Sequence, residues 1–290
     1  MKKYPALFLC LSGVFISFSQ ETSTKDKQTN DVIDSFFEKD QIIDDVLASF
    51  TKYQFLYLSV NYNNDTYFSG RDIGIKQYNV SPKITYLHSS GIYANISGIY
   101  YSEFEPKWDL TTATLGYGKS FGKEKTFKYY ASYTRYFYNN GLDNAFSNDI
   151  SLGIGIRNKK KTLGTQLSGS YLFGNEQSFQ VASTSYITFK LLKTKKTQLD
   201  LKPQISIIAG DQTIELARSY VQNGQLITDI TKNNVFGLIN TQLSLPLEFS
   251  ANSFDFQLGY NINFPTPIGE ESNLKNTSYF NFSMAYLIDL

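Results

Sequence analysis

Polar and apolar residues alternate along most of the chain after residue 53. The clearest run ends the chain, where Phe280, Phe282, Met284, Tyr286, Ile288 and Leu290 alternate with Asn281, Ser283, Ala285, Leu287 and Asp289. Successive side chains of a β-strand point to opposite faces, so a period of two separates the apolar set from the mostly polar set. The pattern predicts a strand with one apolar face that runs to the last residue.

From Tyr53 onward the pattern predicts strands only, about twelve in all. The predicted strands are 53–63, 77–88, 91–103, 109–120, 126–138, 148–157, 163–173, 178–190, 197–209, 235–249, 252–264 and 278–290. Each is near or above the ~10 residues that a tilted strand needs to cross the hydrocarbon of a membrane. The orientation of the strand at 126–138 stays open, because aromatic residues occupy both of its faces.

The connections between these strands fall into two kinds in strict rotation. The short ones are HSSG, FGKEKT, NKKKT, LKTKKT and SAN, and the generally longer ones are 64–76, 104–108, 139–147, 174–177, 210–234 and 265–277. Short turns at one end and longer loops at the other are typical of membrane barrels. In the longest loop, residues 216–221 and 225–230 flank Asn223-Gly224, a favoured hairpin turn, so the strands beside it are expected to extend as a ribbon.

The N-terminus has the features of a secretory signal peptide. Lys2 and Lys3 precede an apolar stretch from residue 6 to 18, and Ser17 and Ser19 suit cleavage between residues 19 and 20. The only cysteine of the chain, Cys10, lies inside this stretch, so the mature protein is expected to contain no disulfide and no thiolate metal site. No later stretch has the ~18 continuous apolar residues of a transmembrane helix.

Residues 31–50 carry apolar side chains at helical spacing, with acidic side chains on much of the remaining surface. The apolar set is Val32, Ile33, Phe36, Phe37, Ile43, Val46, Leu47 and Phe50, and the acidic set is Asp31, Asp34, Glu38, Asp40, Asp44 and Asp45. This spacing predicts one amphipathic helix of roughly five turns. Three roles are open for it: a cap on the end of the barrel, a plug inside it, or a helix that docks a partner.

The chain resembles the outer-membrane β-barrel proteins of diderm (Gram-negative) bacteria. The resemblance rests on the alternating strands, the rotation of short and long connections, and the apolar final strand. The resemblance covers residues 53–290 and the signal peptide. It implies a transmembrane antiparallel up-and-down β-barrel of about twelve strands, surrounded by outer-membrane lipids and lipopolysaccharide, with both termini in the periplasm. It also implies that the barrel-assembly machinery reads the C-terminal strand. A secreted soluble β-barrel or sandwich is the alternative.

The expected organisation is a signal peptide over 1–19, a periplasmic extension with the amphipathic helix over 20–50, and the barrel over 51–290. Aromatic residues are 16% of the chain, with 22 Tyr and 23 Phe, which suits interfacial girdles at the strand ends. The formal net charge is +1, so no charge bias indicates a nucleic-acid partner.

Two short motifs and one histidine are the only candidates for catalytic chemistry, and each has a simpler explanation. Residues 118–122 (GKSFG) match a nucleophile elbow and contain the GKS of a phosphate loop, but no histidine follows, and Ala113 stands where the phosphate loop needs glycine. His88, the single histidine, falls in a predicted short turn, away from the outer leaflet where lipid-modifying barrels act. We therefore expect no enzyme activity, cofactor or metal; a barrel that hydrolyses lipid acyl chains is the third hypothesis for function.

Eight charged residues fall on the face predicted to line the lumen: Lys83, Arg157, Lys190, Asp200, Lys202, Glu248, Asp255 and Asp289. All except Lys83 lie near the periplasmic ends of their strands. They are expected to form either a salt-bridge network that fills the lower barrel or a mixed-charge constriction that filters solutes. The short turns also carry lysines, which are expected to be solvated near lipid headgroups or to dock the acidic helix: Lys123, Lys125, Lys159, Lys160, Lys161, Lys193, Lys195 and Lys196.

Two main functions remain open from the sequence. The first is a small channel or transport barrel with a polar lumen, capped by the helix at 31–50. The second is a non-conducting structural or accessory barrel that binds a protein partner in a larger envelope complex.

Overall fold

The computed structural model describes residues 54–290, except for 123–124, 140–145, 195, 223–224, 268–273 and the side chains of 212–235. The signal peptide expected over 1–19 and the helix expected over 31–50 lie outside the described residues. The strands in the described part are β1 (Gln54–Asn63), β2 (Tyr67–Phe68), β3 (Arg71–Asp72), β4 (Asn79–His88), β5 (Ile92–Tyr101), β6 (Trp108–Phe121), β7 (Phe127–Tyr138), β8 (Phe146–Arg157), β9 (Leu163–Gly174), β10 (Gln177–Ile187), β11 (Phe189–Lys193), β12 (Thr197–Leu201), β13 (Gln204–Gln222), β14 (Gln225–Ser244), β15 (Leu247–Ala251), β16 (Phe254–Pro265) and β17 (Thr277–Asp289). No helix found among these residues is long and apolar enough to cross a membrane.

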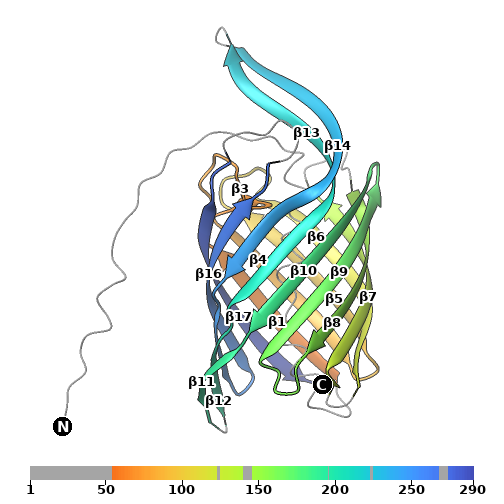
Figure 1. The fold of residues 1–290 in the computed structure, drawn as a ribbon, viewed down its shortest axis with the longest axis vertical. Coiled ribbons are helices and arrows are strands. Elements are labelled where there is room, and N and C mark those ends of the chain that lie inside the picture. The colour runs from red at the N-terminus through yellow and green to blue at the C-terminus, as the bar shows by residue number, and fades with distance from the viewer. Residues whose placement is uncertain (1–53, 123–124, 140–145, 195, 223–224, 268–273) are drawn as a thin grey trace, which may run out of the picture.

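All of these strands except the small β2–β3 hairpin form one antiparallel sheet that closes into a barrel (Figure 1). The last strand, β17, pairs with both β16 and β1, which joins the two edges of the sheet. Three barrel strands are each built from two segments, namely β10 with β11, β12 with β13, and β14 with β15, so twelve strands surround the interior. The structure confirms the predicted fold class, an all-β antiparallel barrel of twelve strands.

Prolines divide two of the predicted strands. Pro203 separates β12 from β13, and Pro246 separates β14 from β15, because proline has no backbone N–H for the ladder of hydrogen bonds. The backbone carbonyl groups of both prolines still accept hydrogen bonds from neighbouring strands. Lys202 N donates to Pro246 O (3.0 Å), and Ile187 N donates to Pro203 O (3.0 Å). The strands predicted at 197–209 and 235–249 are therefore present but interrupted near one end of the barrel.

The outer surface of the barrel is apolar and its inner surface is mostly polar. On β8, Leu152 and Ile154 point outward and are 61% and 62% exposed, whereas Ser151, next to Leu152, points inward and is 1% exposed. On β17, Phe280, Phe282, Met284 and Tyr286 are exposed on the outer face, as predicted. In a closed barrel, neighbouring strands can pair the backbone N–H and C=O groups with each other by hydrogen bonds, so water is not needed. A strand in a lipid bilayer requires this pairing.

The strand whose orientation the sequence left open is β7. Phe127, Tyr129, Tyr133 and Phe137 lie on its outer face. Its inner face carries Lys128, Tyr130, Ser132, Thr134 and Tyr136. The outer face of β7 is therefore mainly aromatic, and its inner face combines one cation with polar and aromatic groups.

The two ends of the barrel differ. One end, called the turn end from here on, carries the short turns after β4, β6, β8, β11 and β15, together with the C-terminus (Figure 1). The other, called the loop end, carries the longer connections and the β13–β14 hairpin, whose pairing continues as far as Gln222 and Gln225. Most of the segment predicted as a loop at 210–234 is thus paired strand, and the expected ribbon beyond the barrel is confirmed.

Candidate functional site

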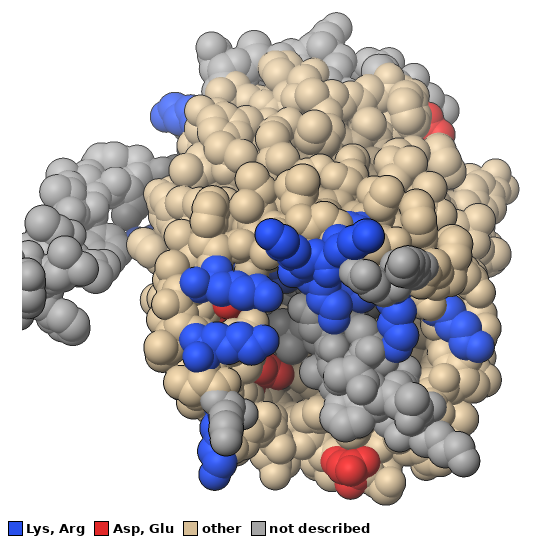
Figure 2. Space-filling view, turned by 60° about the horizontal axis from the view of Figure 1, so that its bottom comes forward, with Lys and Arg blue, Asp and Glu red and all other residues tan. Residues whose placement is uncertain are grey.

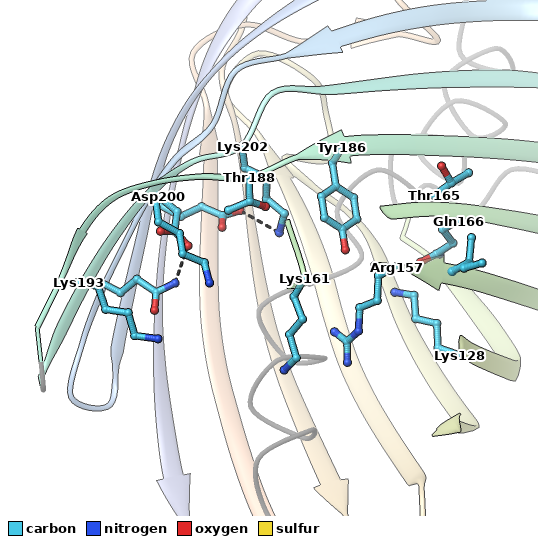
Figure 3. A pocket seen from close by; sticks show the side chains of 14 residues that line it. Lys128, Arg157, Lys161, Thr165, Gln166, Tyr186, Thr188, Lys193, Asp200 and Lys202 are labelled. Carbon is cyan, nitrogen blue, oxygen red and sulfur yellow. Dashed lines mark hydrogen bonds and ion pairs between the residues drawn. The ribbon is translucent and has the colours of Figure 1, made fainter. Parts of the chain in front are cut away.

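A cavity of about 390 Å³ lies inside the barrel at the turn end (Figure 3). Fourteen side chains line it: Lys128, Ile156, Arg157, Lys161, Thr165, Gln166, Tyr186, Thr188, Lys190, Lys193, Gln198, Asp200, Lys202 and Glu248. They come from one continuous part of the wall, from β7 through β8, β9, β10, β11 and β12 to β15. One side of the lumen therefore supplies the whole site.

Small residues on β8 make room for the long side chains of β7. A Cβ atom added at Gly155 would lie 2.7 Å from Cε of Lys128, and one added at Gly153 would overlap the ring of Tyr130. These residues are paired across the two strands, Lys128 with Gly155 and Tyr130 with Gly153. Glycine on the inner face of β8 therefore allows Lys128 to lie across that strand and reach the cavity.

The lining is strongly cationic. It contains six basic side chains, Lys128, Arg157, Lys161, Lys190, Lys193 and Lys202, but only two acidic ones, Asp200 and Glu248. Seen from the turn end, Lys and Arg gather around the opening of the barrel (Figure 2). Fields from charges of one sign add in a concave site with walls of low dielectric, so this wall is expected to attract anions.

Both acidic side chains of the cavity have partners within the site. Oε1 of Glu248 lies 3.5 Å from Nζ of Lys202, which also lies 5.0 Å from the centre of the Tyr186 ring. Oδ2 of Asp200 accepts a hydrogen bond from Nε2 of Gln198 (2.5 Å). Nε of Arg157 donates to the carbonyl oxygen of Lys125 (3.1 Å), which fixes the guanidinium at the edge of the cavity.

The structure brings together five of the eight charged residues that the sequence placed in the lumen. Arg157, Lys190, Asp200, Lys202 and Glu248 all line the cavity. The other three are apart from it. Lys83 lies on the same inner face of β4 as buried Thr85, Asp255 lies on β16, and Asp289 is exposed at the end of β17.

Three cavity lysines were not among the predicted lumen residues. Lys161 and Lys193 lie in or beside short turns, and a turn has no alternation from which to read the direction of a side chain. Lys128 was hidden by the aromatic residues on both faces of β7. One feature of the sequence does indicate that Lys128 faces the lumen. The glycines of β8 lie opposite the long inward side chains of β7, for which they leave space.

The other sequence motifs lie away from this site. Ser120 of the GKSFG motif lies on β6, so the strand-turn-helix of a nucleophile elbow is not formed there. His88 ends β4 at the turn end, where its Nδ1 lies 2.8 Å from Oγ of Ser90. Neither residue lines the cavity.

The loop end of the interior is filled by the first long connection, residues 64–78. The β2–β3 hairpin within this connection is buried: Phe68 is 3% exposed, Ser69 0% and Ile73 2%. On one side, the ring of Phe68 packs against Tyr101 and Phe104, with ring centroids 6.5 and 6.2 Å away. The hairpin therefore packs into the barrel instead of projecting from it.

On its other side, the hairpin is held by strands that follow much later in the chain. Oγ1 of Thr277 donates to the carbonyl oxygen of Gly70 (2.8 Å), and Nη2 of Arg71 donates to that of Thr266 (2.9 Å). Gly70 has a φ of 79°, and a Cβ there would lie 2.7 Å from Oδ1 of Asn240. Only glycine fits both the backbone conformation and this close approach.

Side chains of the barrel wall fill the space around the hairpin. Leu110, Tyr136, Phe146 and Leu172 form an apolar cluster on one part of the wall. On another part, Oδ1 of Asn263 accepts hydrogen bonds from Asn240 (3.2 Å) and Gln242 (3.0 Å). Among the described residues, the interior is thus packed at the loop end, and the cationic cavity lies at the turn end.

The hairpin connection contains a carboxyl group that responds to this packing. Burial raises the pKa of Asp65 above its usual value, although hydrogen bonds from Thr66 N (2.9 Å) and Tyr67 Oη (3.1 Å) oppose the rise. The same burial, together with the charge of Asp65, raises the pKa of Tyr67. The packed connection therefore favours the protonated form of Asp65.

We expect the packing of residues 64–78 to depend on pH. A raised pKa in the packed state means that protonation of Asp65 stabilises it fully below the ordinary aspartate pKa, and that this contribution is lost as the pH rises through the raised value. Limited proteolysis of the 64–78 connection at stepped pH should show protection at acid pH and faster cleavage as the pH rises. Asp65→Asn should remove this step, and a pH response that survives the substitution would contradict the assignment.

Comparison with known proteins gives only distant likenesses to solved structures. No protein-family model and no curated protein matches the chain. Among solved structures, it is similar to the KdgM porin in complex with disordered oligogalacturonate (9% identity, TM-score 0.45, 79% of this chain and 98% of that one). It is also similar to the COG4313 outer membrane channel from Pseudomonas putida F1 (11%, TM-score 0.47, 82% and 95%) and to LpxR from Salmonella typhimurium (11%, TM-score 0.43, 80% and 99%).

These likenesses are too distant to transfer a substrate or an activity. The fold rests on features of the chain itself, namely the closed seam between β1 and β17, the apolar exterior and the polar interior. The chain is a twelve-stranded β-barrel of the outer-membrane type, with no specific family identified.

Proposed function

We propose that this chain forms a channel in the bacterial outer membrane that favours small anionic solutes. In this proposal the turn end faces the periplasm and the loop end faces the exterior, as short turns and long loops do in bacterial barrels. The cationic cavity is the observation that carries the proposal: six basic and two acidic side chains surround about 390 Å³ inside the barrel. That volume suits a small molecule.

In the proposed channel, residues 20–50 cap the opening of the barrel on the periplasmic side. Their acidic segment is opposite in sign to the cavity lining. The resting channel is closed there, and at the loop end by residues 64–78. Solute passes only when both ends open.

Single-channel recording in planar bilayers tests the proposal. The chain from residue 20 and a second form without residues 20–50 are refolded, and circular dichroism verifies the barrel. We expect larger or more frequent openings from the shorter form, and a reversal potential under a salt gradient that reports preference for anions. Folded barrels that stay silent in both forms, or that prefer cations, would contradict the proposal.

A non-conducting accessory barrel is the second candidate, and one observation favours it. The loop-end half of the interior is packed by the β2–β3 hairpin, the apolar cluster around Leu172 and the amide groups around Asn263. A barrel whose interior is a packed core needs no pore. Silence of both refolded forms would support this candidate, and the search would then move to protein partners of the β13–β14 hairpin.

A further inference from the structure

One part of the barrel wall has an open edge at the turn end. The ladder between β9 and β10 ends at the pair of Leu163 with Ile187, and Thr188 N makes one further bond to Thr162 O (2.8 Å). The chain then continues as β11, which projects at the turn end together with β12 (Figure 1). Within the described part of the chain, β11 pairs with β12 alone. Its other edge, called the open edge from here on, therefore has no neighbouring strand there.

The inner face of β11 carries two lysines. Lys190 pairs with Asp200 and Lys193 pairs with Gln198, and all four residues line the cavity. A spacing of three would put the two lysines on opposite faces of a regular strand. The register shifts by one residue between Lys190 and Leu192, as in a β-bulge. This shift turns Lys193 toward the cavity, since a bulge changes the direction of the side chains that follow it.

Apolar side chains cover the outer surface beside the open edge. Phe189, Leu191 and Leu192 of β11 are 51%, 55% and 50% exposed. Leu163 and Ile187, at the end of the neighbouring ladder, are 51% and 47% exposed. Removing such groups from water is favourable, so this surface suits an apolar ligand.

On the inner side, the same edge borders the cationic cavity. Lys161, from the turn after β8, lines the cavity together with Lys190 and Lys193 of β11 (Figure 3). An edge strand also presents backbone N–H groups that no second strand binds, and these can donate to phosphate oxygens. A ligand that crosses the open edge therefore meets cations and N–H donors inside and apolar side chains outside.

We propose that the open edge binds an anionic glycerophospholipid of the surrounding leaflet, with the headgroup phosphate among Lys161, Lys190 and Lys193. The acyl chains lie outside, on Phe189 and Leu192. The inference goes beyond the proposed channel, because the ligand is a membrane lipid and its binding requires no passage through the barrel. An added polypeptide strand suits the open edge less well, because the register shift interrupts the regular ladder that such a strand needs.

Quenching of a fluorescent label by brominated lipids measures which lipid occupies the site. The only cysteine lies in the expected signal peptide, so one introduced cysteine in the chain from residue 20 is labelled selectively. Ile187→Cys carries a bimane label beside the open edge, and Ile96→Cys, exposed on the outer face of β5, is the reference position. The barrels are placed in vesicles of phosphatidylcholine and phosphatidylglycerol, with bromine on the acyl chains of one lipid at a time.

The label on Ile187→Cys should report a preference for phosphatidylglycerol. Its quenching ratio should favour this lipid by about fivefold or more, because one lysine close to an anionic headgroup already accounts for such a factor. The label on Ile96→Cys should report a ratio near one. Glutamine in place of Lys161, Lys190 and Lys193 should bring the ratio at the open edge close to one as well.

A matched variant tests whether the position of the lysines matters. Lys119→Gln, Lys159→Gln and Lys160→Gln remove the same charge from exposed residues outside the cavity lining, and they should leave the preference unchanged. Circular dichroism verifies the barrel in every variant. Equal loss of the preference in the two triple variants would overturn the site, since general attraction of the barrel for anionic lipid would then explain it.

Soluble glycerol phosphate distinguishes a lipid site from a site for free phosphate. At the same concentration as the anionic lipid it should leave the quenching ratio unchanged, because it has no acyl chains. Loss of the preference would mean that the lysines bind free phosphate and that the open edge holds no lipid. A ratio near one at the open edge before any lysine is replaced would also overturn the inference. A clear preference in a barrel that never conducts would support the lipid site and refute the proposed channel.

Discussion

Replacing Lys128, Lys161 and Lys193 by glutamine should abolish the preference of the channel for anions. The three residues supply half of the basic side chains of the cavity, and Asp200 and Glu248 remain. The local potential should fall close to zero, and the ratio of anion to cation permeability should fall by roughly an order of magnitude. The reversal potential under a salt gradient, recorded without residues 20–50, measures this ratio.

A matched variant separates the position of the charge from its amount. Lys119→Gln, Lys159→Gln and Lys160→Gln remove the same net charge, but these lysines are exposed outside the cavity lining. They should leave the reversal potential nearly unchanged, because solvent and salt screen them from the lumen. Equal effects of the two triple variants would mean that the cavity does not determine selectivity.

Displacing the β2–β3 hairpin should increase conductance several-fold, because this hairpin fills the loop end. Gly70→Val introduces a Cβ only 2.7 Å from Oδ1 of Asn240, at a φ of 79° that a β-branched residue does not tolerate. The hairpin tip must then move away from Asn240 and from Thr277, which donates to the carbonyl of residue 70. Single-channel conductance without residues 20–50 reports the result.

Another glycine on the barrel provides the control. Gly237 on β14 has nothing within 4 Å of an added Cβ and no left-handed backbone, so Gly237→Val should leave conductance unchanged. Thr277→Ala should give a smaller increase than Gly70→Val, since it removes one hydrogen bond and causes no overlap. If Gly70→Val folds and conducts like the parent, the hairpin does not limit passage.

The sequence predicted the barrel well because a lipid-facing strand must alternate. Every predicted strand has a counterpart, and Phe280, Phe282, Met284 and Tyr286 of the outward set predicted on β17 are exposed on its outer face. Its errors have local causes. Pro203 and Pro246 divided two strands, and the ribbon expected around Asn223-Gly224 extends over more of the 210–234 connection than the sequence indicated, because its two halves pair along their length.

The site was only partly predictable, because its residues come from several strands and meet only in the folded barrel. Alternation placed Arg157, Asp200 and Lys202 on the inner face, and all three line the cavity. It could not orient Lys161 or Lys193, which lie in or beside turns. The position of the β2–β3 hairpin inside the barrel could not be predicted from the alternation of polar and apolar residues. It depends on single contacts, such as that of Gly70 with Asn240.

The seam between β1 and β17 has a consequence for how the protein forms. Its paired residues, from Phe55 with Asp289 to Asn63 with Asn281, are more than 200 residues apart in the chain. Contacts of such high sequence separation form late and slowly, because the intervening chain must first be ordered. Until the last strand arrives, β1 and β16 are open edges that can pair with other chains. Synthesis and insertion must therefore protect a nearly complete sheet, and loss of the thirteen residues of β17 should leave an aggregating open sheet instead of a smaller barrel.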